Sequence, residues 1–179
     1  MHALDRIETP RELELLVAFS DLTVFARFAR TCSIGDLFDM VSEYYEFAGD
    51  IIEGSGGKIV KFIGDAILIT YAAEDVNRGV LALRELKDAG DAWLDSRKVS
   101  CRHVIKAHFG PVFGGMVGTR RVKQFDFFGE TVNIAATLRS NGFAITPQVF
   151  RKLDPDTRKQ FKKHTPPITY IPVGESHKD

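Results

Sequence analysis

Apolar residues follow two different periods along the chain, and their alternation predicts the order of strands and helices. The run LELLVAFSDL at residues 13–22 is apolar with a β-prone centre, which is typical of a buried strand that ends near Asp21. From Ile34 to Ile51 apolar side chains recur at helical spacing, and the glycine-rich GSGG at 54–57 ends that pattern. We therefore expect a buried strand followed by an amphipathic helix.

Two further strands are predicted by KIVKFIG and AILITY, which are joined tightly around Gly64 and Asp65. Helical spacing returns over residues 74–96, and CRHVIKAHFG at 101–110 predicts another strand. A glycine-rich hairpin at PVFGGMVG and a short helix over 129–140 are expected to follow. The order strand, helix, strand, strand, helix, strand is the ferredoxin-like, split βαβ pattern of an α+β fold, with its helices on one face of the sheet.

The length of 179 residues suits one domain with a sizeable core. We predict that this domain covers residues 13–179, including a C-terminal extension, and that residues 1–12 are a leader or linker. The chain has 24 basic and 24 acidic side chains, which gives no bulk electrostatic reason to expect nucleic acid or an anionic membrane as a partner. The basic cluster of Arg120, Arg121 and Lys123 lacks interleaved aromatic side chains and is typical of a solvated loop.

Cysteine usage and the length of apolar runs limit the cellular context. Cys32 and Cys101 are too few for a disulfide framework or a Cys-based metal site. No apolar run approaches the roughly 18 residues needed to span a bilayer, and the N-terminal MHALDRIETPRELE lacks the apolar core of a signal peptide. We expect a cytoplasmic protein, or a cytoplasmic piece of a longer one, without membrane contact in this segment.

Two aspartates far apart in the sequence are predicted to meet at one edge of the sheet. The first two strands of the expected topology run parallel, so Asp21 at the end of one and Asp65 in the turn after the other lie at the same edge, on adjacent strands. Paired carboxylates without an equally placed cation suit Mg²⁺ or Mn²⁺, which would hold phosphates. Aspartates are also common at turns without any ligand, so spacing alone leaves both interpretations open.

Four motifs stand in order along the chain: FSDLTVF from residue 19, KFIGDAILI from 61, HFGPVFGGMVG from 108 and QFDFFGETVNIAA from 124. They resemble F-A-D-I-x-G-F, K-x-x-G-D-x-x-x, H-x-G-x-V-x-x-G-x-x-G and Y-D-x-x-G-x-x-V-N-x-A of the class III nucleotidyl cyclases, the adenylate and guanylate cyclases. The resemblance runs from about Leu13 to the end of the chain. It implies the class III cyclase catalytic fold.

The resemblance also implies a reaction, in which the ribose 3′-hydroxyl of a nucleoside triphosphate attacks the α-phosphorus and releases pyrophosphate. It implies two Mg²⁺ or Mn²⁺ ions on Asp21 and Asp65, with help from the backbone carbonyl of Leu22. One ion would lower the pKa of the attacking hydroxyl, and the other would neutralise charge on the phosphates and the leaving group. Two copies are expected to pair head to tail as a homodimer with shared active sites at the interface.

By the same resemblance, Lys61 and Asp126 read the purine of the nucleotide bound at the metal site of the partner domain. A lysine donor and a carboxylate acceptor match the acceptor N1 and the exocyclic amine of adenine. Guanine presents the opposite polarity on this edge, which would leave buried polar groups unpaired, so ATP is the implied substrate. Without the motif, Lys61 would be interpreted as a solvated strand lysine and Asp126 as a strand-end charge.

Three further residues are candidates through the resemblance. Asn133 matches the asparagine that orients the ribose. The alternative is that Asn133 is only a polar residue on an exposed helix face. Phe25, which closes the first motif, is a substrate-binding candidate. KKHTPPITY resembles a segment with a phosphate-binding lysine, for which Lys163 is the candidate and Lys162 its rival. Two adjacent lysines at a surface are usually only solvated, which is the alternative interpretation.

The chain departs from the family pattern at three positions. Val24 stands where a glycine lets the backbone approach the triphosphate, and Ala26 replaces a usual threonine. Thr137 stands where an arginine stabilises the transition-state phosphate, a type of donor whose loss costs roughly 100- to 1000-fold in rate. Arg139 lies two residues on, about 200° around a helix, and is expected to point away from the site unless the helix end unwinds.

Two classes of function therefore stay open. Retention of Asp21, Asp65, Lys61, Asp126 and Asn133 favours an adenylate cyclase, active as a homodimer and weakened by Thr137. Loss of the arginine and the glycine favours a cyclase-homology domain that binds nucleotide or a partner and regulates without turnover. A guanylate cyclase ranks third.

Overall fold

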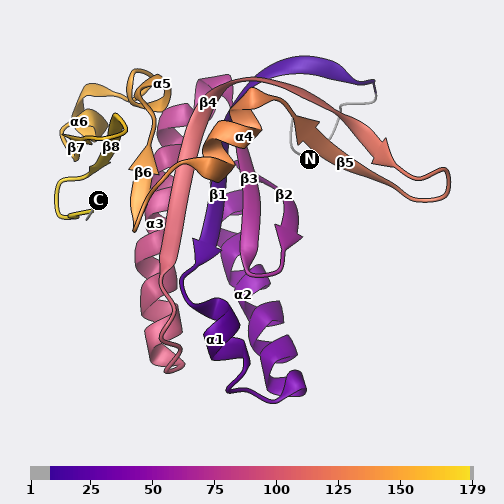
Figure 1. The fold of residues 1–179 in the computed structure, drawn as a ribbon. Helices are drawn as coiled ribbons and strands as arrows, with labels where there is room; N and C mark the ends of the chain where they lie inside the picture. The colour runs from indigo at the N-terminus through magenta and orange to yellow at the C-terminus, as the bar shows by residue number, and fades with distance from the viewer. Residues whose placement is uncertain (1–8, 178–179) are drawn as a thin grey trace.

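A mostly antiparallel sheet forms the centre of the molecule, with two long helices on one of its faces (Figure 1). The computed structural model describes residues 9–177. The strands are β1 (Arg11–Leu22), β2 (Lys58–Ile63), β3 (Ala66–Ala72), β4 (His103–Gly118), β5 (Lys123–Phe128), β6 (Phe143–Ile145), β7 (Phe161–His164) and β8 (Thr169–Pro172). The helices are α1 (Phe25–Ala29), α2 (Ile34–Gly54), the 3₁₀ helix η2 (Ala73–Asp75), α3 (Val76–Ser96), α4 (Glu130–Thr137), α5 (Pro147–Phe150) and α6 (Pro155–Arg158).

The order of elements confirms the ferredoxin-like α+β prediction. The strands follow one another across the sheet as β2-β3-β1-β4-β6-β8-β7, and β5 pairs with β4. β1 and β2 point the same way, because both are antiparallel to β3. They are not neighbours as the sequence suggested, since β3 lies between them. The end of β1 nevertheless meets the turn before β3, because Ser20 is paired with Ile67.

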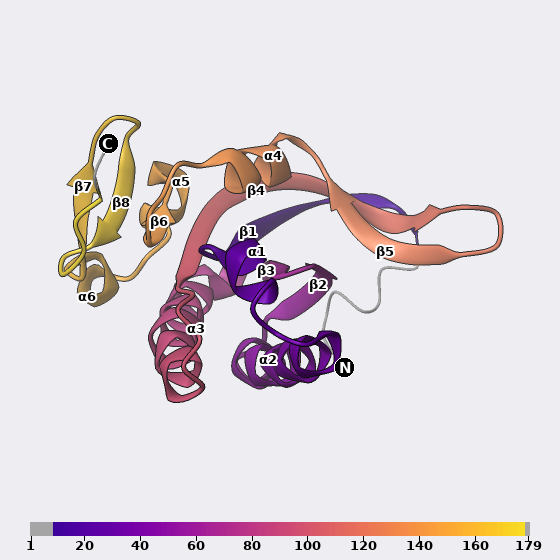
Figure 2. The ribbon, with the colours of Figure 1, turned by 60° about the horizontal axis from the view of Figure 1, so that its bottom comes forward.

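The two faces of the sheet are filled by alternate residues of each strand, as a period of two requires. On one face, Leu16 and Ala18 belong to the large core beneath α2 and α3, which confirms the predicted helical layer. On the other face, Leu15 and Val17 pack in a smaller cluster with Ala135 of α4. Figure 2 shows the two long helices on one side of the sheet and the short α4 on the other.

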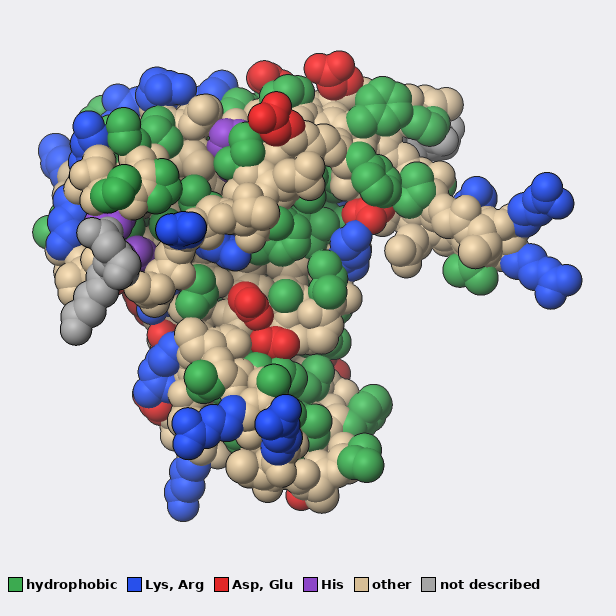
Figure 3. All heavy atoms as spheres, viewed as in Figure 1, with side chains coloured by type: hydrophobic (Ala, Val, Ile, Leu, Met, Phe, Trp, Pro, Cys, Tyr) green, Lys and Arg blue, Asp and Glu red, His purple; other side chains and the backbone are tan. Residues whose placement is uncertain are grey.

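The predicted glycine-rich hairpin is present, and PVFGGMVG forms its first strand. β4 runs unbroken through this segment to Gly118, and with β5 it forms an arm that projects beyond the body of the protein (Figure 1). Its glycines serve close packing, because a Cβ at Gly114 would lie 2.5 Å from the ring of Phe127. The chain turns only after Gly118, and Lys and Arg side chains surround the tip of the arm (Figure 3).

The described chain begins with β1 and ends with a group of small elements. β1 begins at Arg11, two residues before the expected start of the domain, and residues 1–8 of the expected leader lie outside the described residues. The C-terminal extension consists of the small elements from β6 to β8, none of which was predicted individually. Within residues 9–177, no helix is both long and apolar enough to cross a membrane.

A buried polar network ties both long helices to β4. The side chain of His103 is fully buried, with Nε2 lying 3.0 Å from the hydroxyl of Tyr44 on α2 and Nδ1 lying 2.9 Å from a carboxylate oxygen of Asp91 on α3. Burial raises the pKa of Asp91, but hydrogen bonds from His103 and Lys87 outweigh it and lower that pKa to about 2. Each buried polar atom of the imidazole is therefore paired.

We predict that Tyr44→Phe lowers the free energy of unfolding by about 1 to 3 kcal/mol, because Nε2 of His103 would stay buried without a partner. Urea unfolding followed by circular dichroism measures the change. Tyr170→Phe is the control, since the Tyr170 hydroxyl has no hydrogen bond among the described residues while its ring stacks on Phe150. Equal losses in the two variants would contradict the role given to the network.

Candidate functional site

The carboxylates of Asp21 and Asp65 converge on one backbone nitrogen at the end of β1. The N–H of Leu22 lies 2.9 Å from Oδ1 of Asp21 and 3.3 Å from Oδ2 of Asp65. Asp21 is exposed and Asp65 is partly buried. In Figure 3, acidic side chains appear at the surface over this end of β1. The predicted proximity of the two aspartates is thus present in the fold.

The two carboxylates repel each other in the absence of a cation. Burial raises the pKa of Asp65 to about 6, and the neighbouring Asp21 adds to the rise. The two carboxylates are hard oxygen donors, and repulsion between their charges disfavours their ionisation. They fit a divalent cation, because the cation would remove this repulsion. Among residues 9–177 there is no cluster of three or more His, Cys, Asp or Glu side chains for a metal. Further ligands would be the Leu22 carbonyl, water and phosphate oxygens.

The turn that carries Asp65 is fixed from the side of α2. Gly64 has φ +63° at the first position of a two-residue hairpin turn, a backbone region that glycine enters without steric cost. The hydroxyl of Tyr45 donates to the Gly64 carbonyl over 2.5 Å. The Tyr45 ring also stacks on Phe62, with ring centroids 3.7 Å apart. This support was not predicted from the sequence, because Tyr45 lies outside all four motifs.

Lys61 and Asp126 are brought together within one chain. Nζ of Lys61 lies 2.5 Å from Oδ2 of Asp126, and the other oxygen of Asp126 accepts from the N–H of Phe127. The Asp126 side chain is 7% exposed and that of Lys61 is 35% exposed. The pair joins β2 to β5, on strands that are not neighbours in the sheet, and presents a donor and an acceptor side by side.

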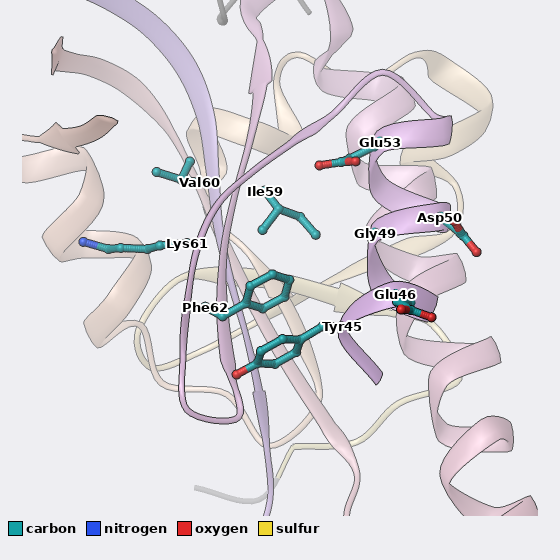
Figure 4. Close-up of a pocket in the computed structure, with 9 residues that line it drawn as sticks. All are labelled: Tyr45, Glu46, Gly49, Asp50, Glu53, Ile59, Val60, Lys61 and Phe62. Carbon is teal, nitrogen blue, oxygen red and sulfur yellow. The ribbon is translucent and has the colours of Figure 1, made fainter. Parts of the chain in front are cut away.

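A cavity of about 550 Å³ lies between α2 and β2 but does not contain this chemistry. Figure 4 shows its walls, with Tyr45 and Phe62 on one side and the acidic residues Glu46, Asp50 and Glu53 of α2 on the other. Lys61 belongs to its rim, and the figure shows the Lys61 side chain directed away from the cavity. We therefore place the candidate site at the carboxylates and at Lys61–Asp126, not in this cavity.

The segment after Asp21 keeps a glycine-like backbone although it has no glycine. Val24 has φ 51° and ψ 19°, in the left-handed region, where a non-glycine residue costs about 1 to 2 kcal/mol. Its carbonyl accepts from the N–H groups of Arg27 and Phe28 and so starts α1. Phe25 opens this helix and is partly buried against the main core. The substitution thus leaves the local turn in place under strain.

The helix register predicted for Arg139 is wrong, because α4 is shorter than expected. The helix ends at Thr137, and Leu138 is extended with φ −57° and ψ 130°. Thr137 and Arg139 therefore line the same cavity of about 410 Å³ instead of facing opposite sides. The turn-forming sequence Ser-Asn-Gly at 140–142 was the signal that could have predicted the early end.

The other predicted side chains have distinct environments. Asn133 is exposed on α4, and its carbonyl accepts the Thr137 hydroxyl over 2.7 Å, so this hydroxyl is directed back to its own helix. Lys162 donates to the carbonyl of Val173, whereas Lys163 is exposed on the adjacent position of β7. Ala26 is exposed within α1. The amine of Lys162 is thus bound to the Val173 carbonyl, and that of Lys163 is not.

Comparison with known proteins identifies the family of this chain. The model of the adenylate and guanylate cyclase catalytic domain matches residues 7–172. An adenylate cyclase of Streptomyces coelicolor is 30% identical over 128 residues, which are 70% of this chain and 29% of that protein. A receptor-type guanylate cyclase of Caenorhabditis elegans is 29% identical over 137 residues, 70% of this chain and 12% of that protein. The chain thus spans less than a third of these relatives.

Solved structures share the fold. The adenylyl cyclase CyaB from P. aeruginosa has a TM-score of 0.80 at 16% identity, with 96% of this chain and 98% of that one covered. The guanylate cyclase domain of RhGC from Catenaria anguillulae, in complex with GTP, has a TM-score of 0.73 at 20% identity, covering 86% and 87%. With the family match over most of its length, the chain belongs to the adenylate and guanylate cyclase catalytic-domain family.

Proposed function

We propose that this domain is an adenylate cyclase that converts ATP to cyclic AMP and pyrophosphate. The observation that carries the choice of base is the Lys61–Asp126 pair. Lys61 retains further N–H donors for adenine N1, and Asp126 retains acceptor capacity for the exocyclic amine. With guanine, the Lys61 donor would face the N1–H donor and the Asp126 acceptor would face the carbonyl oxygen. Both mismatches would cost binding free energy in a partly buried site.

The chemistry proposed for the other end of the nucleotide rests on Asp21 and Asp65. These carboxylates, with the Leu22 carbonyl, would hold two Mg²⁺ or Mn²⁺ ions. When bound, such ions would lower the pKa of the ribose 3′-hydroxyl and neutralise charge on the phosphates and the leaving pyrophosphate. Asn133 would orient the ribose, Phe25 would line the substrate site, and Lys163 would bind phosphate.

A head-to-tail homodimer is proposed because it would place Lys61 and Asp126 of one chain opposite the carboxylates of the other. The arm of β4 and β5 supports this proposal, since it exposes apolar side chains that a monomer leaves in water. Phe113 and Phe128 are paired across the arm and are each 53% exposed, and Met116 is 48% exposed. An isologous pairing would bury both copies of this surface.

The second candidate function is a regulatory cyclase-homology domain without turnover. It is favoured by Thr137, because a hydroxyl that donates to the Asn133 carbonyl supplies no cation at the transition state. An assay of purified protein with Mn²⁺ and either ATP or GTP separates the candidates. Cyclic AMP from ATP supports the first proposal. Cyclic GMP from GTP alone would reverse the base assignment, and no product with intact nucleotide binding would favour regulation.

We predict that Lys61→Met lowers kcat/KM for ATP by roughly 10- to 100-fold, because one charged hydrogen bond to the base is lost. The ratio of kcat/KM for ATP to that for GTP should fall with it. Lys159→Met is the matched control, since Lys159 is a surface lysine of the C-terminal region paired only with Asp156. A variant that keeps the parent's ATP preference would remove Lys61 from base recognition.

Asp65→Asn is expected to stabilise the metal-free protein at pH 7 and to abolish its stabilisation by Mn²⁺. The pKa of Asp65 is raised to about 6, so folding favours the protonated form, and its contribution is lost as the pH rises from about 4 to about 6. The amide removes both the repulsion and the pH dependence. Melting temperatures measured from pH 4 to 8, with and without Mn²⁺, test this. Mn²⁺ stabilisation that survives in the variant would contradict the metal assignment.

For the dimer, we predict that Phe113→Ser with Phe128→Ser weakens self-association at least 10-fold, because apolar area at the arm is no longer buried. Sedimentation velocity at micromolar concentration, with Mg²⁺ and a non-hydrolysable ATP analogue, measures it. Ile34→Ser with Phe38→Ser is the matched control on α2, where these side chains are 90% and 71% exposed. A parent that stays monomeric, or a dimer broken only by the α2 variant, would refute the arm as the interface.

A further inference from the structure

The cavity between α2 and β2 lies outside the candidate site, and its lining is partly apolar and partly acidic. Its volume of about 550 Å³ falls within the range of about 300 to 1,000 Å³ that small-molecule sites occupy. A glycine in the middle of a helix lowers the helix stability relative to alanine. Gly49 of α2 has no packing reason for this cost, because a Cβ there would meet no heavy atom within 4 Å. Gly49 lines the cavity instead, so the missing side chain preserves space for a ligand.

The apolar wall offers a flat aromatic surface. The rings of Tyr45 and Phe62 stack with centroids 3.7 Å apart and an interplanar angle of 13°. The stack does not remove Phe62 from water, since this residue is 36% exposed. Burial of the remaining ring area by a planar apolar group would be favourable, and the face of an aromatic ring also attracts a cation.

The charges around the cavity favour a cation. Among the described residues, the lining carboxylates of Glu46, Asp50 and Glu53 make no ion pair or hydrogen bond. The sequence of α2 contains no lysine or arginine to neutralise them. The amine of Lys61 is bound to Asp126, and Figure 4 shows the Lys61 side chain directed away from the cavity. An amidinium or guanidinium could donate two parallel hydrogen bonds to one of these carboxylates.

The cavity is connected to the turn that carries Asp65. The hydroxyl of Tyr45 donates to the Gly64 carbonyl, and Phe62 lies in β2 just before this turn. Burial raises the pKa of the Tyr45 hydroxyl, and the charge of Asp65 adds to the rise. A ligand that packs on Tyr45 and Phe62 would therefore act on the residues that hold Asp65 in place.

We propose that this cavity binds a small planar organic cation, in which an amidinium or guanidinium group is attached to an apolar or aromatic body. The body packs on the Tyr45–Phe62 stack, and the cationic group pairs with the carboxylates of α2. By restricting Tyr45, the bound cation stabilises the Gly64–Asp65 turn and raises the affinity of Asp21 and Asp65 for a divalent ion. This last step rests on the proposed function, whereas binding of the organic cation does not.

Amide NMR spectra of the full chain, titrated with benzamidine, test the site. We expect saturable binding with shifts at Gly49 and Phe62, roughly 10-fold tighter than for the uncharged benzamide. Gly49→Leu should weaken it roughly 10-fold or more, because leucine would occupy the space of the ligand. The matched control is Gly54→Leu, at an α2 glycine that also has no heavy atom within 4 Å of a Cβ and does not line the cavity. No binding by the parent, equal binding by both variants, or equal affinity for both probes would overturn the proposal.

A charge variant tests the same site without changing its shape. Figure 4 shows the Glu53 side chain directed from α2 toward β2. Glu53→Gln should weaken benzamidine binding roughly 3- to 10-fold and leave benzamide binding unchanged, because one charged acceptor becomes neutral. Asp39→Asn is the control, since Asp39 is exposed on α2 outside the cavity. Equal losses of benzamidine affinity in the two variants would refute the pairing with the cavity carboxylates.

Calorimetric titration with Mn²⁺, with and without saturating benzamidine, tests the connection to the metal ligands. We expect Mn²⁺ to bind roughly 5-fold more tightly when benzamidine is present, and Mn²⁺ must then raise the affinity for benzamidine by the same factor. Gly49→Leu should show no such gain. Unchanged Mn²⁺ affinity beside saturable benzamidine binding would refute the coupling. Absence of Mn²⁺ binding would refute the metal assignment and the coupling with it, but not the site for the organic cation.

Discussion

The site depends on one constraint, which is that the register of β1 and β3 holds two carboxylates against a single N–H group. The Leu22 nitrogen cannot satisfy both charges, and burial of Asp65 increases the cost of ionising it. The strands cannot relax this arrangement, because their inner residues are fully buried beneath α2 and α3. A divalent cation at these carboxylates would remove the repulsion, and its binding would then stabilise the native state.

The second charged pair has the opposite character. Lys61 and Asp126 neutralise each other across β2 and β5, and Asp126 also accepts a backbone N–H. The role proposed for this pair is directional, because a fixed donor beside a fixed acceptor would discriminate between bases by hydrogen-bond polarity. The unneutralised carboxylates of Asp21 and Asp65 and the neutralised Lys61–Asp126 pair thus lie in different parts of the same sheet. The proposed dimer would bring the carboxylates of one chain close to the pair of the other.

The length of α4 decides where Arg139 lies relative to Thr137. One more turn of helix would have carried Arg139 to the far side, as an ideal helix requires. The extended Leu138 ends the helix and places Thr137 and Arg139 at one cavity. The backbone of Val24 is also unusual, since its left-handed conformation preserves a turn that the Val24 side chain disfavours. At both positions the local backbone conformation differs from the one that the sequence predicts.

The sequence by itself determined the order of elements, because the periods of apolar residues distinguish strands from helices in the ferredoxin-like unit. It also predicted that Asp21 and Asp65 lie at the same end of the sheet, although their contact comes from the pairing of β1 with β3. Only the tertiary structure decided that β3 separates β1 from β2, that β4 continues through its glycines, and that α4 stops at Thr137. In the sequence, a glycine at a close contact looks like a turn residue, and a helix that ends early looks like a longer helix. Packing against side chains distant in the sequence, such as that of Phe127 against Gly114, distinguishes the first two cases.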